Sequence, residues 1–395
     1  DYADGAEATV QIAGINADQQ GMTVGKQYIL PDGSLTTDAS SGGGGDYVVG
    51  TPEVFNSAAT QSNSSTYDPV ANKVVITYTD EGNSNYGTAV VGTVSGDSIT
   101  FGTPVVFNSG LATYISTTYD STADKIVIAY VDTDNSNYGT AIVGTVSGDS
   151  ITFGTSEVFN SGYVSFTHAT YDPVANKVVI TYTDYGNSQY GTAIVGTVSG
   201  NSITFGSPEV FNSSSTSLFL TAYDLVANKV VIVYQDRGNS NYGTAVVGTV
   251  SGDSIAFGAS VVFNSGETFL NSATYDSVNN KVVIAYQDRG NSSYGTAIAG
   301  TVSGDSTTFG TPTVFSNKST THISAVYDPV ADKVVVAYFG NNVGTAITYC
   351  AGRTTINLTS ENFIGVSTDD YADGAEATVQ IAGINADQQG MTVGK

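Results

Sequence analysis

An internal repeat of 52 residues constrains the fold of this chain more than any other feature of its sequence. The dipeptide Tyr-Asp returns at this interval, and one lysine and one phenylalanine per unit return with it. The six tyrosines are Tyr67, Tyr119, Tyr171, Tyr223, Tyr275 and Tyr327. Self-similarity at a fixed period predicts an array of structural modules, each of which packs on its neighbours.

Each unit predicts four short antiparallel strands joined by tight turns. Typical strand sequences are ISTTYD, KVVITYTD, YGTAVVGTV and ITFGTPVVF, which are rich in β-branched residues and tyrosine. The second and third strands are apolar on both faces, which indicates a sheet covered on both sides. Four-stranded units of this length are typical of β-propeller blades. The alternative is a stacked β-solenoid, whose shorter, parallel rungs do not suit hairpin turns such as SGDS.

The two ends of the array predict how the ring closes. The run Asp46–Phe55 matches the fourth strand of a unit, whereas the last unit stops after its third strand, near Cys350. We therefore expect an all-β, six-bladed propeller over residues 46–351, in which Asp46–Phe55 pairs with the strand around Gly344–Cys350. Such closure removes the exposed edges of an open array.

The chain begins and ends with the same 26 residues, at Asp1–Lys26 and Asp370–Lys395. Their flanking segments, including Gln27–Leu35 and Phe363–Val366, join into one small β-domain when placed in order. Residues 1–45 and 352–395 are thus each expected to be part of such a linker domain, with a flexible glycine-rich link at Ser40–Gly45. Two interpretations remain: a window from a longer polypeptide with a 369-residue unit, or a subunit completed by strand exchange with neighbouring chains. Both predict identical units along a fibre axis.

Composition narrows the range of partners. The chain has 36 acidic and 12 basic residues and a net charge of -24, which argues against nucleic acid as a partner. It has no apolar run of 18 residues or more, so no membrane span is predicted. No cofactor is indicated, although the Asp- and Asn-rich loops could bind Ca²⁺ through their oxygen atoms. The same residues are also what tight turns require.

An enzyme would need catalytic groups that break the repeat and lie together. His168 and His322 both fall in the first strand of a unit, but at different offsets, which predicts isolated polar residues. The D-x-G-N-S-x-Y loops loosely resemble the Asp-box of sialidases, with one extra residue and no Trp. Arg237 and Arg289 occupy equivalent loop positions, so they do not form an arginine triad. We expect no enzyme activity.

The connection between the fourth strand and the next first strand varies strongly from unit to unit, whereas the other turns hardly change. In a propeller this connection shares one rim with the loop between the second and third strands. Variable loops on a rigid scaffold commonly carry binding sites. The alternative explanation of this variability is neutral sequence drift on a surface that no function constrains. The candidate ligand-binding residues of this rim are Tyr114, Phe166, Phe219, Arg237, Phe269 and Arg289.

Several turns contain Asp-Ser followed by an apolar residue or Thr, which is similar to the O-glycosylation signal of Bacteroidota-type bacteria. The candidate serines are Ser98, Ser121, Ser150, Ser254, Ser277 and Ser306. One turn reads GNSI instead, with Asn201 before Ser202, so Ser202 is expected to stay unmodified. Gly, Asp and Ser also suit hairpin turns without any sugar.

The runs YDPVANKVVITYTD, NYGTAVVGTVSG and SITFGTPVVFNSG resemble propeller repeats of very large surface proteins and phage tail-associated proteins of aquatic bacteria and their viruses. ENFIGVS with GMTVGKQYILPDGSL resembles a small β-module that often accompanies them, although Met22 and Val24 replace the commoner Leu and Pro. The resemblance implies an extracellular protein at a cell or virion surface, and it assigns no chemistry to any residue. We expect a structural unit of a glycosylated bead-on-string fibre. The alternative is an adhesin or phage receptor-binding fibre that recognises glycans through its variable rim.

Overall fold

The computed structural model describes residues 52–350, apart from 97, 330, 341 and 342, and four two-residue strands nearer the ends. The chain divides into two compact units, Gly50–Arg353 and the two ends taken together. At the ends, β1 (Tyr28–Ile29) pairs with β2 (Leu35–Thr36), and β26 (Val366–Ser367) pairs with β27 (Val379–Gln380). The rest of the expected linker domain lies outside the described residues. No helix in the described part of the chain is long and apolar enough to cross a membrane.

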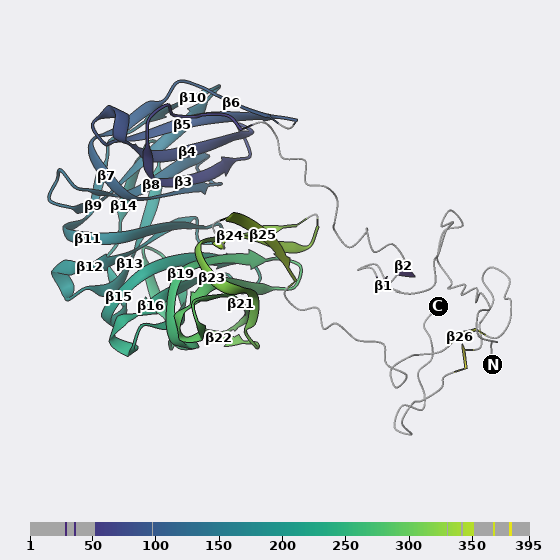
Figure 1. Ribbon diagram of the computed structural model, residues 1–395. Coiled ribbons are helices and arrows are strands. Elements are labelled where there is room, and N and C mark those ends of the chain that lie inside the picture. The colour runs from purple at the N-terminus through teal and green to yellow at the C-terminus, as the bar shows by residue number, and fades with distance from the viewer. Residues whose placement is uncertain are drawn as a thin grey trace. The chain divides into compact units, whose positions relative to one another are not determined.

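The central unit is a six-bladed β-propeller, as predicted, and the order of its strands closes into a ring (Figure 1). The innermost strand of each blade comes from β3 (Thr60–Asp68), β7 (Val105–Asp120), β11 (Glu157–Asp172), β15 (Glu209–Asp224), β19 (Val261–Asp276) or β23 (Thr313–Asp328). The second strands are β4 (Lys73–Asp80), β8 (Lys125–Asp132), β12 (Lys177–Asp184), β16 (Lys229–Asp236), β20 (Lys281–Asp288) and β24 (Lys333–Gly340).

The third strands lie outside the second strands and start the outer part of each blade. They are β5 (Tyr86–Ser95), β9 (Tyr138–Ser147), β13 (Tyr190–Ser199), β17 (Tyr242–Ser251), β21 (Tyr294–Ser303) and β25 (Val343–Tyr349). Five of them turn back into the short strands β6 (Ser98–Phe101), β10 (Ser150–Phe153), β14 (Ser202–Phe205), β18 (Ser254–Phe257) and β22 (Ser306–Phe309). In four blades a short 3₁₀ helix joins the second and third strands: η1 (Glu81–Asn83), η2 (Tyr185–Asn187), η3 (Arg237–Asn239) and η4 (Arg289–Asn291).

The fourth strand of one blade and the first strand of the next form one continuous strand, which differs from the expected loop between them. The beginning of β11 pairs with β9 of the second blade, and its end pairs with β12 of the third blade. The residues in between, NSGYVS, look like a loop in sequence, yet two different sheets hold them in extended conformation. Each long strand therefore runs from the outer edge of one blade to the centre of the next.

Apolar residues on both faces of the second and third strands fill the space between blades. In β12 the six residues from Val178 to Thr183 are all buried, as the two-sided apolar pattern predicted. A recurrent pair reinforces this packing: the Phe159 ring contacts the buried Tyr182 ring of the following blade, with centroids 5.2 Å apart. The ring of Phe159 also fills the place where a Cβ atom on Gly139 would lie, which explains the recurrent Tyr-Gly at the start of the third strands.

The closing segment differs in part from the expectation. Of Asp46–Phe55, the structure describes Pro52–Phe55, which is not in a strand, and the remainder lies outside the described residues. The Phe55 ring still packs 5.2 Å from Tyr78, as Phe107 packs on Tyr130 in the next blade. Among the residues that the structure describes, a Cβ on Gly344 would meet no atom within 4 Å. Phe55 thus packs on the first blade, and the pairing of the rest of Asp46–Phe55 with β25 stays a prediction.

Candidate functional site

A bulge recurs in every innermost strand on the rim that also carries the 3₁₀ helices. In β7 the pairing with β8 shifts register between Thr113 and Ser116, and in β11 the same shift follows Ser165. The residue inside the bulge has a left-handed backbone, with φ of 48° at Tyr114, 51° at Phe166 and 53° at His322. Bulky residues rarely adopt this conformation, and such strain is concentrated at functional sites.

The bulges bring aromatic side chains of neighbouring blades together. The ring centroids of Tyr114 and Phe166 are 4.9 Å apart, and those of Phe166 and Phe219 are 6.5 Å apart. Phe219 is buried against Phe211, whereas 41% of Tyr114 is exposed. A row of rings therefore runs from the buried end at Phe219 to the exposed end at Tyr114.

Two further tyrosines, which sequence reasoning missed, lie on the same rim. Tyr163 of β11 and Tyr185 of η2 stack with ring centroids 4.3 Å apart and planes 22° apart, and Tyr163 is 46% exposed. Both positions vary between units. Two blades further round the ring, the corresponding residues are Glu267 and Arg289, which form an ion pair. Only these two units carry a matched pair at the two positions, so the sequence gives a weak signal for the contact.

Electrostatics places Tyr114 near this stack and near Arg237. The pKa of Tyr114 is raised, mainly by burial. The neighbouring Tyr163 and Tyr185 also raise this pKa, whereas the positive charge of Arg237 lowers it. Arg237 begins η3, is exposed, and has no ion pair or hydrogen bond with the residues that the structure describes. We call Tyr114, Tyr163, Phe166, Tyr185 and Arg237 the rim cluster.

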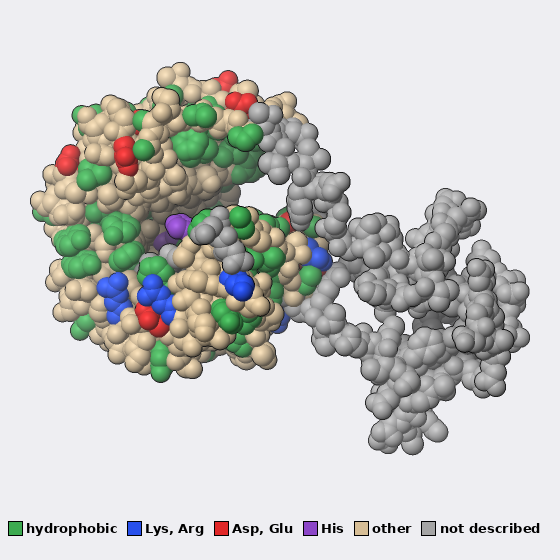
Figure 2. Space-filling model, in the orientation of Figure 1, with side chains coloured by type: hydrophobic (Ala, Val, Ile, Leu, Met, Phe, Trp, Pro, Cys, Tyr) green, Lys and Arg blue, Asp and Glu red, His purple; other side chains and the backbone are tan. Residues whose placement is uncertain are grey.

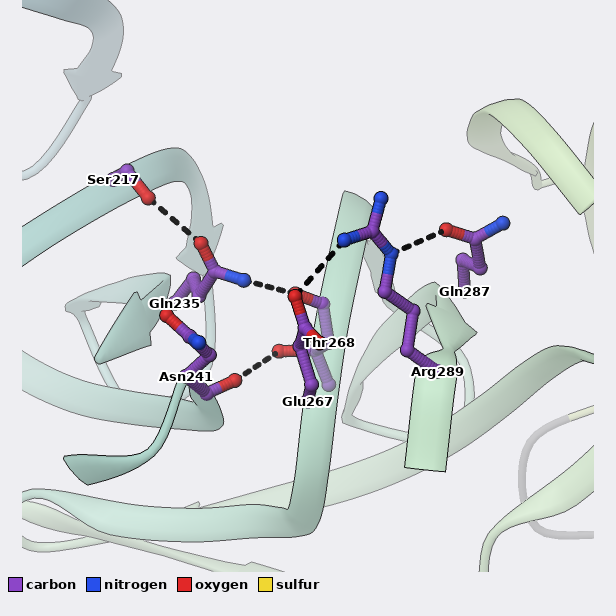
Figure 3. A network of polar contacts seen from close by, with 7 residues as sticks. All are labelled: Ser217, Gln235, Asn241, Glu267, Thr268, Gln287 and Arg289. Carbon is purple, nitrogen blue, oxygen red and sulfur yellow. Dashed lines mark hydrogen bonds and ion pairs between the residues drawn. The ribbon is translucent and has the colours of Figure 1, made fainter. Parts of the chain in front are cut away.

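Two other predicted rim residues, Phe269 and Arg289, contact each other, and Figure 3 shows the polar partners of Arg289. Arg289 donates from Nη1 to Glu267 Oε1 at 2.9 Å and from Nε to Gln287 Oε1 at 3.4 Å. Its guanidinium carbon lies 4.3 Å from the centroid of the Phe269 ring. This guanidinium group is therefore already engaged, in contrast to that of Arg237.

A polar network beneath the rim ties neighbouring blades together (Figure 3). Ser217 donates to Gln235 Oε1 at 2.9 Å, and Gln235 Nε2 donates to the Thr268 carbonyl at 2.6 Å. The Thr268 amide in turn donates to the Asn241 carbonyl at 3.1 Å. Gln235 and Ser217 are buried, and a buried polar network with its partners in place rigidifies the surrounding backbone. The bulge of β19 is thus held in position by the blade before it.

The two histidines are not brought together, as the different offsets indicated. His168 shares a hydrogen bond of 2.8 Å with Thr221 of the next blade, and burial lowers its pKa to about 4. His322 is exposed and contacts Thr321 and Phe339 instead. Figure 2 shows histidine side chains beside the hollow at the centre of the propeller. His168 is therefore neutral at pH 7.

The loops that resemble an Asp-box have a structural explanation. Asp80 accepts a hydrogen bond from the Gly82 amide at 3.0 Å and one from Asn56 Nδ2 at 2.9 Å. Asp184 accepts from the Asn187 amide and from Asn160 Nδ2 in the same way. These aspartates cap the 3₁₀ helices and fix the preceding long strand. In the described part of the chain, no three His, Cys, Asp or Glu residues are grouped closely enough to hold a metal ion.

The six candidate glycosylation serines are all exposed, and the aspartates beside three of them, Asp149, Asp253 and Asp305, help to join neighbouring blades. Lys177 Nζ lies 2.7 Å from Asp253 Oδ1 of the next blade, and Lys73–Asp149 and Lys229–Asp305 repeat this ion pair. Lys73 donates a hydrogen bond to Asp149 and holds the pKa of that carboxyl below its usual value. The Asp of the Asp-Ser motif thus has a structural role in these turns, and modification of the serines remains a prediction.

Comparison with known proteins supports the fold. No family model matches the sequence, and no curated protein matches it either. The BP39L lectin from Burkholderia pseudomallei aligns with a TM-score of 0.54 at 10% identity, over 74% of this chain and 82% of the lectin. The six-bladed fungal lectin from Aleuria aurantia aligns with a TM-score of 0.42 at 14% identity, over 74% and 96%. A mutant sialidase of Trypanosoma rangeli has a TM-score of 0.46 at 11% identity, over 73% and 54%. The first of these shows a shared propeller fold.

Proposed function

We propose that this protein binds glycans through the rim cluster. The observation that carries the proposal is an exposed tyrosine stack on the same rim as a guanidinium group with no partner among the described residues. Aromatic rings offer flat apolar surfaces on which the C–H face of a sugar packs, and tyrosine hydroxyl groups donate and accept hydrogen bonds. A free guanidinium group supplies several donors for sugar hydroxyls or for a carboxylate.

Rigidity of the rim supports the same proposal. The left-handed backbone at Tyr114 and Phe166 fixes where these rings project, and Phe219 supports them from below. A preformed site loses little conformational entropy when a ligand binds, which matters for a weakly held sugar. The lectins that share this fold bear on its architecture alone, since a fold does not determine a ligand.

The test is a glycan array probed with the full chain, followed by titration of the best glycan. We expect Tyr163→Ala to weaken binding at least about tenfold, because it removes the exposed half of the stack and the surface buried under a sugar ring. Arg237→Ala is expected to have a similar effect on glycans that carry a carboxylate.

The matched control is Ser319→Ala, which changes the same repeat position three blades away on the same rim. Binding by this variant should equal that of the unchanged chain. A blank array, or a glycan bound equally well by the chain and by Tyr163→Ala, would show that the rim cluster is not a glycan site.

A second candidate function is that of a repeated structural unit in an extracellular fibre, at a cell or virion surface. The specific observation in its favour is the exact identity of the two 26-residue ends. Identical ends allow one linker domain to be shared between successive units along an axis. A parent gene that encodes many units of 369 residues would support this assembly. If the gene encodes a single unit, fibres would have to form by strand exchange between chains, and electron microscopy of the purified chain would show whether they do.

We also propose that the exposed Asp-Ser turns carry O-linked sugar in the native protein. Their position at hairpin turns leaves room for a bulky, hydrated group. Glycopeptide masses should show sugar at Ser150 and Ser254 and none at Ser202, whose turn has Asn201 in place of Asp. Bare serines at all three positions, or equal modification of Ser202, would contradict the motif.

A further inference from the structure

A cavity of about 590 Å³ lies at the opposite end of the innermost strands from the rim cluster. Its walls include a tyrosine from the Tyr-Asp dipeptide of five successive blades: Tyr119, Tyr171, Tyr223, Tyr275 and Tyr327. Threonines of the innermost strands and apolar turn residues, such as Leu225 and Pro173, complete the lining. The strand β11 connects the two regions, with Tyr163 near the rim and Tyr171 at the cavity.

Three of these tyrosines use their hydroxyl groups within their own turns, whereas the buried hydroxyl of Tyr223 has no hydrogen-bond partner among the described residues. Tyr119 donates to Asp124 Oδ1 at 2.9 Å, Tyr275 to Asn280 Oδ1 at 2.7 Å, and Tyr327 to Asp332 Oδ1 at 3.1 Å. Each acceptor lies five residues further on, in the turn after the innermost strand. These three tyrosines are thus fixed in the wall by their own turns, and what they offer to a ligand is the aromatic ring.

The aspartates of the same dipeptides lie buried behind the rings. Asp172 and Asp224 are 3% and 0% exposed, and Oδ1 of each accepts two backbone amides of the following turn. The Oδ2 atom of Asp224 is buried and has no hydrogen-bond partner. Burial, followed by the charge of Asp224, raises the pKa of Tyr275 to about 12, which indicates a negative potential at the ring.

No Lys, Arg or His lines the cavity, so nothing among its described lining residues would attract an anion. Aromatic rings attract a cation over their faces, and carboxylates behind the rings add to the attraction. A neutral sugar would gain the ring contact and hydrogen bonds to lining hydroxyl groups, but no attraction to the carboxylates. We propose that the tyrosine-lined cavity binds an organic cation, an ammonium group carried on a small apolar body.

The test uses choline as the probe and 3,3-dimethylbutan-1-ol, its uncharged isostere, as the comparison. Titration of the full chain should show choline binding at least about fivefold more tightly than the isostere, since only the charge differs. Added salt should weaken the binding of choline and leave that of the isostere unchanged. Equal affinity for the two probes, or no detectable binding of choline, would overturn the proposal.

Variants of one tyrosine separate the ring from its hydroxyl group. Tyr275→Leu should lower the affinity for choline about threefold, whereas Tyr275→Phe keeps the ring and should bind within about twofold of the unchanged chain. Tyr67→Leu changes the same repeat position in the first blade, none of whose described residues lines the cavity, so this control should bind choline normally. If Tyr275→Leu does not fold, Tyr119→Leu and Tyr119→Phe provide the same comparison three inner strands of the ring away. The proposed cation site would be contradicted if a Phe variant lost choline binding. It would also be contradicted if every Leu variant bound choline as tightly as the unchanged chain.

Discussion

Gly206→Ala should lower the free energy of unfolding by about 3 kcal/mol, the upper part of the usual range for overpacking. Gly206 follows β14 in the third blade, and a Cβ on it would lie 1.8 Å from the Asp253 carbonyl oxygen in the fourth blade. The obstacle is backbone in a hairpin turn, which a side-chain rotation cannot clear. The two blades must therefore separate locally, and with them the Lys177–Asp253 ion pair would be disturbed. Denaturant unfolding measures the change directly.

The chain provides a matched control for this substitution. Gly310 holds the same repeat position in the fifth blade, where a Cβ would meet, among the described residues, only the Ala299 carbonyl oxygen, at 3.6 Å. Gly310→Ala should therefore change the free energy of unfolding by less than about 1 kcal/mol. Equal effects at the two positions would show that the contact between hairpin turn and neighbouring blade does not decide the outcome.

The second large effect is a pH dependence of stability that comes from His168. Its pKa is lowered from 6.5 to about 4 by burial, so the unfolded chain binds a proton at a pH where the folded protein does not. Stability due to this residue is complete above pH 6.5 and is lost as the pH falls from 6.5 towards 4. Between pH 7.5 and pH 5.0 the chain should lose about 2 kcal/mol that His168→Gln does not lose.

The comparison between chain and variant is needed because many carboxylates also respond to pH in this range. Their contribution is common to both proteins and cancels in the difference. His322→Gln removes an exposed imidazole and should keep the pH dependence of the unchanged chain. If His168→Gln keeps it too, His168 does not stay neutral in the folded protein.

Much of the fold follows from sequence periodicity. The second strands begin at Lys73, Lys125 and their equivalents, where the repeat predicts them, because a tight turn that ends in a left-handed Asn or Asp directly precedes each of them. The continuous long strands do not follow from the pattern. Segments such as NSGYVS contain Gly, Asn and Ser, which suggest a loop, and pairing with two different blades is a tertiary effect that no local signal reports.

The candidate site was predictable in part for a similar reason. Variability indicated the rim on which the rim cluster lies and included Tyr114, Phe166 and Arg237. It also included Arg289, whose partner Glu267 satisfies it and which therefore lies outside the cluster. The Tyr163–Tyr185 stack was missed because one residue lies in β11 and the other in η2, 22 positions apart. Left-handed backbone at Tyr114 and Phe166 is also invisible in a sequence, since these residue types rarely adopt it.

The shared long strands bear on how such a protein can change in evolution. Because β11 is the edge of one blade and the centre of the next, the boundary between two blades falls inside a strand, and the third blade is the continuous 52-residue segment 164–215. A recombination that gains or loses 52 codons adds or removes one such segment, and it recreates the same strand at the new junction. Unit number can therefore vary by simple unequal crossing-over, without a new interface between blades. Point changes at the bulges can meanwhile diversify one rim while the opposite end of the ring stays constant.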